Sequence, residues 1–94
     1  MINLIIVSPH GIDTETEIYH CDARDMTPIQ CLKKIWESDL KYFSKNSGSK
    51  EVNTNLSTFT EENEEAYLYF KDGSYYHYEL SFASSITSFF KYSM

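Results

Sequence analysis

A tight turn between two tyrosine-rich segments constrains this chain more than any other feature. Lys71-Asp72-Gly73 has the composition of a three-residue hairpin loop, in which a type I turn is followed by a glycine in the left-handed region. Such a loop pairs Phe70 with Ser74, and because side chains alternate along a strand, it decides which residues share a face. A two-residue loop of Asp72-Gly73 would shift the pairing by one residue and divide the apolar side chains between both faces. The sequence therefore predicts the three-residue loop.

The predicted register gives the hairpin one apolar face and one face rich in tyrosine. The apolar face contains Ala66, Leu68, Phe70, Tyr76, Tyr78, Leu80 and Phe82. The opposite face contains Tyr67, Tyr69, Tyr75, His77 and Glu79. Glutamates also precede the hairpin at Glu61, Glu62, Glu64 and Glu65. We expect the tyrosine face and these glutamates to bind a protein partner, because tyrosine is enriched at interface hot spots and rim carboxylates speed encounter with a basic surface.

Two strands are predicted before residue 22. The run from Ile2 to Val7 is almost wholly apolar and β-branched, which is typical of a strand in the middle of a sheet, and Ser8-Pro9-His10-Gly11 reads as the turn that ends it. Residues 14–21 alternate in polarity, which suits an edge strand with its carboxylates facing solvent.

A long amphipathic helix follows and begins with a clear signal. Thr27 is a typical N-cap, Pro28 suits the first helical position, and Gln30 completes a capping box. Apolar residues then recur at helical spacing at Ile29, Leu32, Trp36, Leu40 and Phe43, flanked by Ile35 and Tyr42.

The second half of the chain is predicted to add three strands and a short C-terminal helix. The strands cover about residues 55–60, 65–71 and 74–82, and Ser84-Ser85 caps a helix that contains Ile86, Phe89 and Phe90. The element order is thus ββαβββα. We expect one small α+β domain over residues 1–94, mainly an antiparallel sheet of about five strands, with a mobile polar loop over residues 44–54.

Charge and composition disfavour several function classes. The 94 residues include 14 acidic and 8 basic side chains, for a net charge of −6, whereas nucleic-acid binding needs a basic surface. We therefore expect no direct contact with nucleic acid. No apolar run approaches the roughly 18–20 residues of a membrane span, and the N-terminus lacks the features of a signal peptide, which together predict a cytoplasmic protein that does not bind a membrane.

Catalytic and metal-binding signatures are also missing from the sequence. His10 lies in a predicted turn, but no nucleophile and orienting group accompany it at a recognisable spacing. His20, Cys21 and Cys31 lack the close pairing that zinc loops use, and the acidic residues from Asp13 to Glu17 do not match a calcium loop. We expect no enzyme activity, no metal and no cofactor.

These observations favour a small stoichiometric inhibitor. Its target would be a basic nucleic-acid-handling protein, met in the host cytoplasm if a phage encodes the chain. In general terms the chain is similar to viral counter-defence proteins of the anti-CRISPR or anti-restriction type, some of which mimic nucleic acid. An immunity protein or antitoxin that neutralises a nuclease is the first alternative. A self-associating structural module is the second, so the chain could be a monomer or a homodimer. The tyrosines could also be covered by the C-terminal helix, or serve only as cross-strand pairs.

Overall fold

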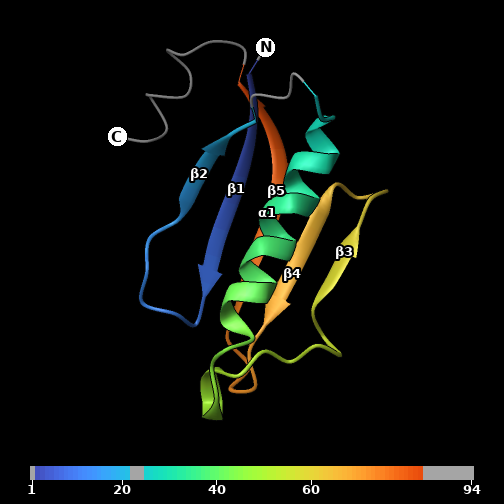
Figure 1. The fold of residues 1–94 in the computed structure, drawn as a ribbon. Coiled ribbons are helices and arrows are strands. Elements are labelled where there is room, and N and C mark those ends of the chain that lie inside the picture. Colours follow the sequence, from blue (N-terminus) through green and yellow to red (C-terminus); the bar gives the residue numbers. More distant parts are fainter. Residues whose placement is uncertain (1, 22–24, 84–94) are drawn as a thin grey trace.

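The computed structural model describes residues 2–21 and 25–83, which form an antiparallel five-stranded sheet with one α-helix lying across one of its faces (Figure 1). The strands are β1 (Ile2–His10), β2 (Glu17–His20), β3 (Thr58–Thr60), β4 (Glu65–Tyr69) and β5 (Tyr75–Ala83). The helix is α1 (Pro28–Phe43), and η1 (Gly48–Lys50) is a 3₁₀ turn. The sheet order is β2-β1-β5-β4-β3. The α+β prediction is confirmed, while the predicted C-terminal helix lies outside the described residues.

The register of the β4–β5 hairpin is the one expected for a three-residue loop. The Phe70 N–H donates to the Ser74 carbonyl at 2.9 Å, and the Gly73 N–H donates to the Phe70 carbonyl at 3.0 Å. Gly73 has a φ of +89°, in the region that glycine occupies without steric cost. Tyr69 consequently pairs with Tyr75, and all later pairs follow that register.

The core lies between α1 and the sheet. Ile5, Leu32, Leu68 and Tyr78 are fully buried there. Residues from the apolar stripe of α1 pack around them, and α1 touches β4, β5 and β1. The apolar face predicted for the hairpin is therefore the face that α1 covers, and the tyrosine face is turned away from the helix.

The start of α1 matches the sequence signals. The Thr27 side chain accepts a hydrogen bond from the Gln30 N–H at 3.3 Å, and the Gln30 side chain accepts one from the Thr27 N–H at 2.8 Å, so the capping box forms. Trp36 also donates its indole N–H to the Tyr67 carbonyl at 2.9 Å, which ties the helix to β4. No helix in the described part of the chain is long and apolar enough to span a membrane.

The first three strands differ in length from the prediction, and β3 covers only Thr58–Thr60 in place of residues 55–60. β1 does not end at Val7 but continues to His10, so the turn assigned to Ser8, Pro9 and His10 was wrong. β2 pairs only with the stretch from Leu4 to Val7, which leaves β1 paired on one side alone at Pro9. A strand tolerates the missing N–H of proline at such an edge position. β2 itself covers only Glu17–His20, not residues 14–21.

The polar segment after α1 contacts the tip of the hairpin. Val52 forms a bridge with Phe70, and the Lys71 N–H donates to the Glu51 carbonyl at 2.8 Å. Lys50 makes an ion pair with Asp72 at 3.0 Å. Hydrogen bonds from Ser74, followed by the hydrogen bond and the charge of Lys50, lower the pKa of Asp72 to about 2. The segment and the hairpin loop therefore support each other at this end of the sheet.

Candidate functional site

A row of stacked rings runs over the sheet face that is turned away from α1. We call His10, Tyr75, Tyr69, Tyr67 and His77 the aromatic row. His10 stacks on Tyr75 with ring centroids 4.6 Å apart, and Tyr75 stacks on Tyr69 at the same separation. Tyr67 stacks on His77 at 4.8 Å and lies 6.1 Å from Tyr69. The four aromatic residues that the sequence assigned to this face from β4 and β5 thus form one connected set of ring contacts.

The stacking determines what the aromatic row can offer to a ligand. The three closest pairs have interplanar angles between 10° and 26°, so these rings lie nearly parallel and cover each other's faces. Their outer edges and hydroxyl groups remain for a partner, since side chains stand roughly perpendicular to a sheet. Each ring in the row is half-buried or exposed, not part of the core. The row can therefore donate and accept hydrogen bonds over a rigid apolar base.

His10 belongs to the row, although no local sequence signal places it there. It pairs with Tyr75 because β1 runs antiparallel beside β5 and extends three residues beyond Val7. The pairing joins residues 10 and 75, which are distant in sequence. A prediction that continued the strand through Pro9 would have placed His10 on one face of β1. The sequence alone would still not have identified β5 as the neighbouring strand.

Carboxylates cluster at one end of the row. The Glu65 Oε2 atom lies 3.0 Å from the His77 Nε2 atom, within hydrogen-bonding distance. Glu65 also lies opposite Glu79 across the β4–β5 ladder. Glu61, Glu62 and Glu64 are exposed in the turn between β3 and β4. We call these five residues the acidic end. Partial burial, and then the charge of Glu65, raise the pKa of the Tyr67 hydroxyl.

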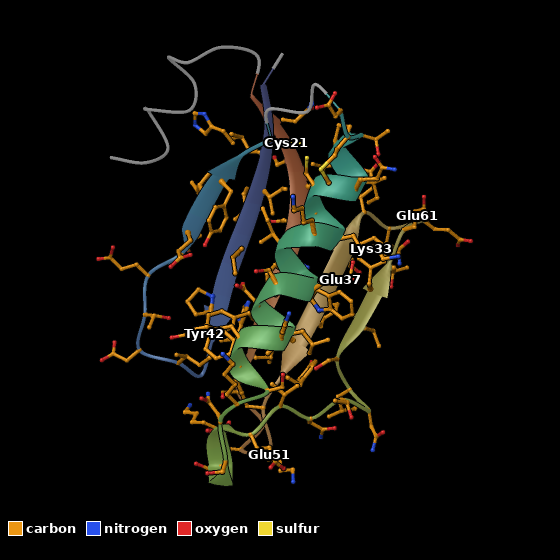
Figure 2. All side chains as sticks on the ribbon, viewed as in Figure 1. Cys21, Lys33, Glu37, Tyr42, Glu51 and Glu61 are labelled. Carbon is orange, nitrogen blue, oxygen red and sulfur yellow. The ribbon has the colours of Figure 1, made fainter. Side chains whose placement is uncertain are left out.

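The other end of the hairpin carries mixed charge. Lys71 pairs with Glu51, and Lys50 pairs with Asp72. Figure 2 shows Glu61 and Glu51 at opposite ends of the long axis of the sheet. The acidic end and the mixed-charge end are therefore separated along the strands, and the aromatic row lies between them.

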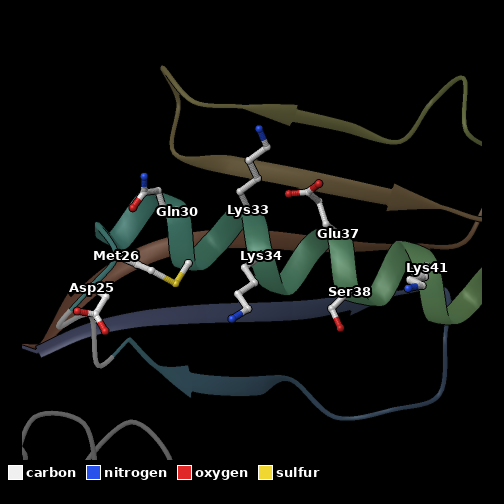
Figure 3. A pocket seen from close by; sticks show the side chains of 8 residues that line it. All are labelled: Asp25, Met26, Gln30, Lys33, Lys34, Glu37, Ser38 and Lys41. Atoms are coloured by element: carbon white, nitrogen blue, oxygen red, sulfur yellow. The ribbon is translucent and has the colours of Figure 1, made fainter.

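A shallow groove on the outer face of α1 is the principal basic feature of the helix. Lys33, Lys34 and Lys41 line it together with the carboxylates of Asp25 and Glu37. Figure 3 shows Lys33 and Lys34 pointing to opposite sides of the helix, so their ammonium groups do not converge. Lys33 instead lies over the Phe59 ring, 5.7 Å from its centroid. This arrangement is that of a solvated helix face, not of a phosphate site.

A cleft of about 300 Å³ lies on the helix side of the sheet, between α1 and the chain that connects β1 to β2. Its wall includes Val7, Thr14, Glu15, Glu17, Tyr19, Asp39, Tyr42, Phe43 and Tyr76. Glu17, whose carboxylate was expected to face solvent on an edge strand, is exposed and also lines this concave surface beside Tyr19. Tyr42 lies on the side of α1 that faces the β1–β2 connection (Figure 2).

Asp39, in the wall of this cleft, accepts a hydrogen bond that the sequence did not indicate. The Tyr78 hydroxyl, which is buried, donates to Asp39 at 2.7 Å. Burial raises the pKa of Tyr78, and the Asp39 hydrogen bond raises it further. Burial also raises the pKa of Asp39, against the opposing effect of the Tyr78 hydrogen bond. A hydrogen bond to Glu17 is the main reason that the pKa of Tyr19 rises to about 12.

The described residues contain no group of three or more His, Cys, Asp or Glu side chains arranged to hold a metal ion. Comparisons of the chain with protein-family models, curated proteins and solved structures gave no match. The surfaces themselves are therefore the basis for any functional argument.

Proposed function

We propose that this chain is a small acidic inhibitor that binds a basic, nucleic-acid-handling protein through the aromatic row and the acidic end. The aromatic row anchors the partner, and the acidic end attracts it and occupies the surface meant for phosphate. The setting would be the cytoplasm of a host cell, with a phage or other mobile element as the source and a counter-defence role of the anti-CRISPR or anti-restriction type.

The observation that supports this proposal most is a continuous aromatic surface next to concentrated negative charge. Tyr67, Tyr69 and Tyr75 are held rigid by one another, so binding a partner orders few additional rotamers. Such pre-ordered tyrosines suit the centre of an interface, and carboxylates suit its rim. A standard interface needs roughly 800 Å² on each partner, which a sheet face with its adjoining turn can supply.

The geometry of the rings favours a protein partner over direct binding of nucleic acid. Base stacking needs a free ring face. The Tyr75 ring is stacked between the rings of His10 and Tyr69, with centroids 4.6 Å apart in each pair, so neither of its faces is free. The adjacent charge is negative at Glu65 and Glu79, which repels phosphate. Hydroxyl groups at ring edges, in contrast, can pair with the arginine, lysine and amide groups of a basic protein surface.

The direct test is capture of the partner from a host lysate, followed by an inhibition assay. The wild-type chain is expected to retain a basic nucleic-acid-binding protein and, when added in equimolar amount, to displace nucleic acid from it. A Tyr67→Phe, Tyr75→Phe double variant keeps the stacked rings but removes two hydroxyls. It should weaken inhibition about tenfold or more, because each lost hydrogen bond is worth about 1 kcal/mol.

Ser38→Ala is the matched control, since it removes one exposed hydroxyl from the outer face of α1. It should inhibit as well as the wild type. Recovery of only acidic partners would refute the proposal. So would full inhibition by both the double Phe variant and a folded Tyr67→Ala, Tyr75→Ala variant.

An immunity protein or antitoxin would use the same surfaces against a nuclease toxin, and the identity of the captured protein distinguishes it from a counter-defence inhibitor. Self-association through the aromatic row is a separate alternative, favoured by the fact that α1 covers only the other face of the sheet. Light scattering at several concentrations tests it. A salt-insensitive dimer that persists when Glu61, Glu62, Glu64 and Glu65 are changed to Gln would favour self-association over electrostatic capture.

A further inference from the structure

The cleft between α1 and the β1–β2 connection places carboxylates and aromatic rings around one concave site. In the aromatic row, by contrast, the carboxylates lie at one end of a sheet face. Glu15, Glu17 and Asp39 contribute three carboxylates, and none of the described lining residues is basic. Asp39 and Glu17 are close enough for their like charges to act on each other. The described lining thus holds a surplus of negative charge at a concave site.

The rings of the cleft are positioned by the core. Phe43 stacks on Tyr76 with centroids 5.7 Å apart and meets Phe70 edge-on at 5.3 Å. Tyr42 packs edge-on against Phe43 at 5.0 Å, yet its own side chain is 67% exposed. Tyr19, at 37% exposed, approaches from the β2 side and donates its hydroxyl to Glu17. Two accessible phenol rings therefore flank the carboxylates.

Asp39 is held in place by the hydrogen bond from Tyr78 to its Oδ2 atom. None of the described residues donates a hydrogen bond to its Oδ1 atom, which leaves acceptor capacity on a half-buried carboxylate. Aromatic faces attract cations, and a planar guanidinium can both stack on a ring and donate paired hydrogen bonds to a carboxylate. The compact ammonium group of a lysine can neutralise the negative charge, but it has no planar face to stack on a ring and no paired donors for a carboxylate.

We propose that this cleft binds the guanidinium group of an arginine side chain presented by another protein. The group enters between Tyr19 and Tyr42 and donates to Asp39 and Glu17. The volume of about 300 Å³ lies at the lower limit for ligand pockets, which suits one side chain and not a larger molecule. This site is on the helix side of the sheet and does not depend on the aromatic row being an interface.

The probe is N-acetylarginine amide, titrated into the isotope-labelled full-length chain while backbone amide shifts are followed by NMR. We expect saturable shifts centred on the cleft, with an affinity in the millimolar range for so small a ligand. N-acetylcitrulline amide, which has nearly the same shape but no charge, should give no saturable shift. N-acetyllysine amide should bind several-fold more weakly than the arginine probe.

Two variants connect the binding to the carboxylates. Asp39→Asn and Glu17→Gln should each weaken arginine binding about tenfold, because each removes a charged acceptor. A Glu61→Gln, Glu62→Gln variant removes two charges far from the cleft and should change the affinity less than twofold. The Tyr67→Phe, Tyr75→Phe variant should also retain arginine binding, which separates this site from the aromatic row.

Equal binding of citrulline, tighter binding of lysine, or unsaturable shifts spread over the surface would each overturn the proposal. So would an equal loss of affinity in the Glu61→Gln, Glu62→Gln variant, because that result would indicate general attraction to an acidic protein. Glu17 is exposed, so Glu17→Gln tests the carboxylates without changing the buried hydrogen bond between Tyr78 and Asp39.

Discussion

At the scale of single residues, the backbone at Gly73 decides which way the tyrosines face. Its φ of +89° closes the hairpin loop after three residues, and a one-residue change of register would send every side chain of β5 to the opposite face. A Cβ atom added at Gly73 would meet no heavy atom within 4 Å. Any effect of substitution there is therefore conformational and not a result of crowding.

Replacing Gly73 with Ala should lower the free energy of unfolding by about 1–2 kcal/mol, the cost of placing an L-residue in the left-handed region. Gly73→Asn should cost less, because asparagine adopts that region more readily. Urea denaturation of the three proteins measures both differences. Equal stability of the Ala variant and the wild type would mean that the loop does not have this conformation in solution.

A second residue-scale feature is the buried hydrogen bond between Tyr78 and Asp39. Asp39→Ala should lower the free energy of unfolding by about 1–3 kcal/mol, because it leaves the Tyr78 hydroxyl buried without an acceptor. Asp39→Ala combined with Tyr78→Phe should cost less than Asp39→Ala alone, since no polar group is then left unpaired. A cost for the double variant equal to the sum of the two single variants would contradict this account.

The raised pKa of Asp39 predicts a specific pH dependence. The folded state binds this proton more tightly than the unfolded state, so the ionised carboxylate lowers stability above its folded pKa. That penalty is lost as the pH falls through the folded pKa toward the unfolded value of about 3.9. Asp39→Asn, which retains an acceptor for Tyr78, should therefore be more stable than the wild type at pH 7, and the difference should shrink toward pH 4. A difference that grows on acidification would contradict the assigned direction.

At the scale of elements, the β4–β5 hairpin places two like charges opposite each other. Glu65 and Glu79 form a direct cross-strand pair, which destabilises a sheet, and His77 relieves this only at Glu65. Glu79 is exposed, and none of the described residues makes an ion pair with it. We propose that its charge serves the acidic end, because a binding surface can retain charge at the expense of stability.

Glu79→Gln should accordingly raise the free energy of unfolding by about 0.5 kcal/mol while weakening capture of a basic partner. The stability gain should shrink at high salt, where the repulsion is screened. Glu61→Gln, which removes a charge from a turn with no cross-strand partner, is the control and should leave stability unchanged. Thermal or urea unfolding at two salt concentrations measures both variants, and a loss of stability in Glu79→Gln would show that the charge is structural.

The elements also show how much local sequence could predict. The hairpin register follows from a glycine at a defined position in a short loop, and the start of α1 follows from Thr27 and Gln30, because both depend on neighbouring residues. The pairing of β1 with β5 joins residues that are distant in the chain, so the position of His10 could not be derived from local signals. The Asp39–Tyr78 bond was missed for the same reason, although a tyrosine predicted for the core needs a hydrogen-bond acceptor.

At the scale of the whole molecule, charge is distributed unevenly between the two ends of the sheet. The acidic end includes the β3–β4 turn, while Lys50 and Lys71 pair with carboxylates at the opposite end. An asymmetric field of this kind orients a basic partner during approach and raises the association rate. Changing Glu61, Glu62 and Glu64 to Gln should slow association with the partner several-fold at low salt and leave the dissociation rate almost unchanged. An effect confined to dissociation would show that these residues make direct contacts instead.

Site-specific photocrosslinking tests the central claim most directly. A benzophenone amino acid placed at position 69 lies within the aromatic row, and the same group at position 34 lies on the outer face of α1. Irradiation of the complex with the captured partner should give a crosslinked product from position 69 and none from position 34. Crosslinking from position 34 with none from position 69 would contradict the claim that the tyrosine face is the partner-binding surface.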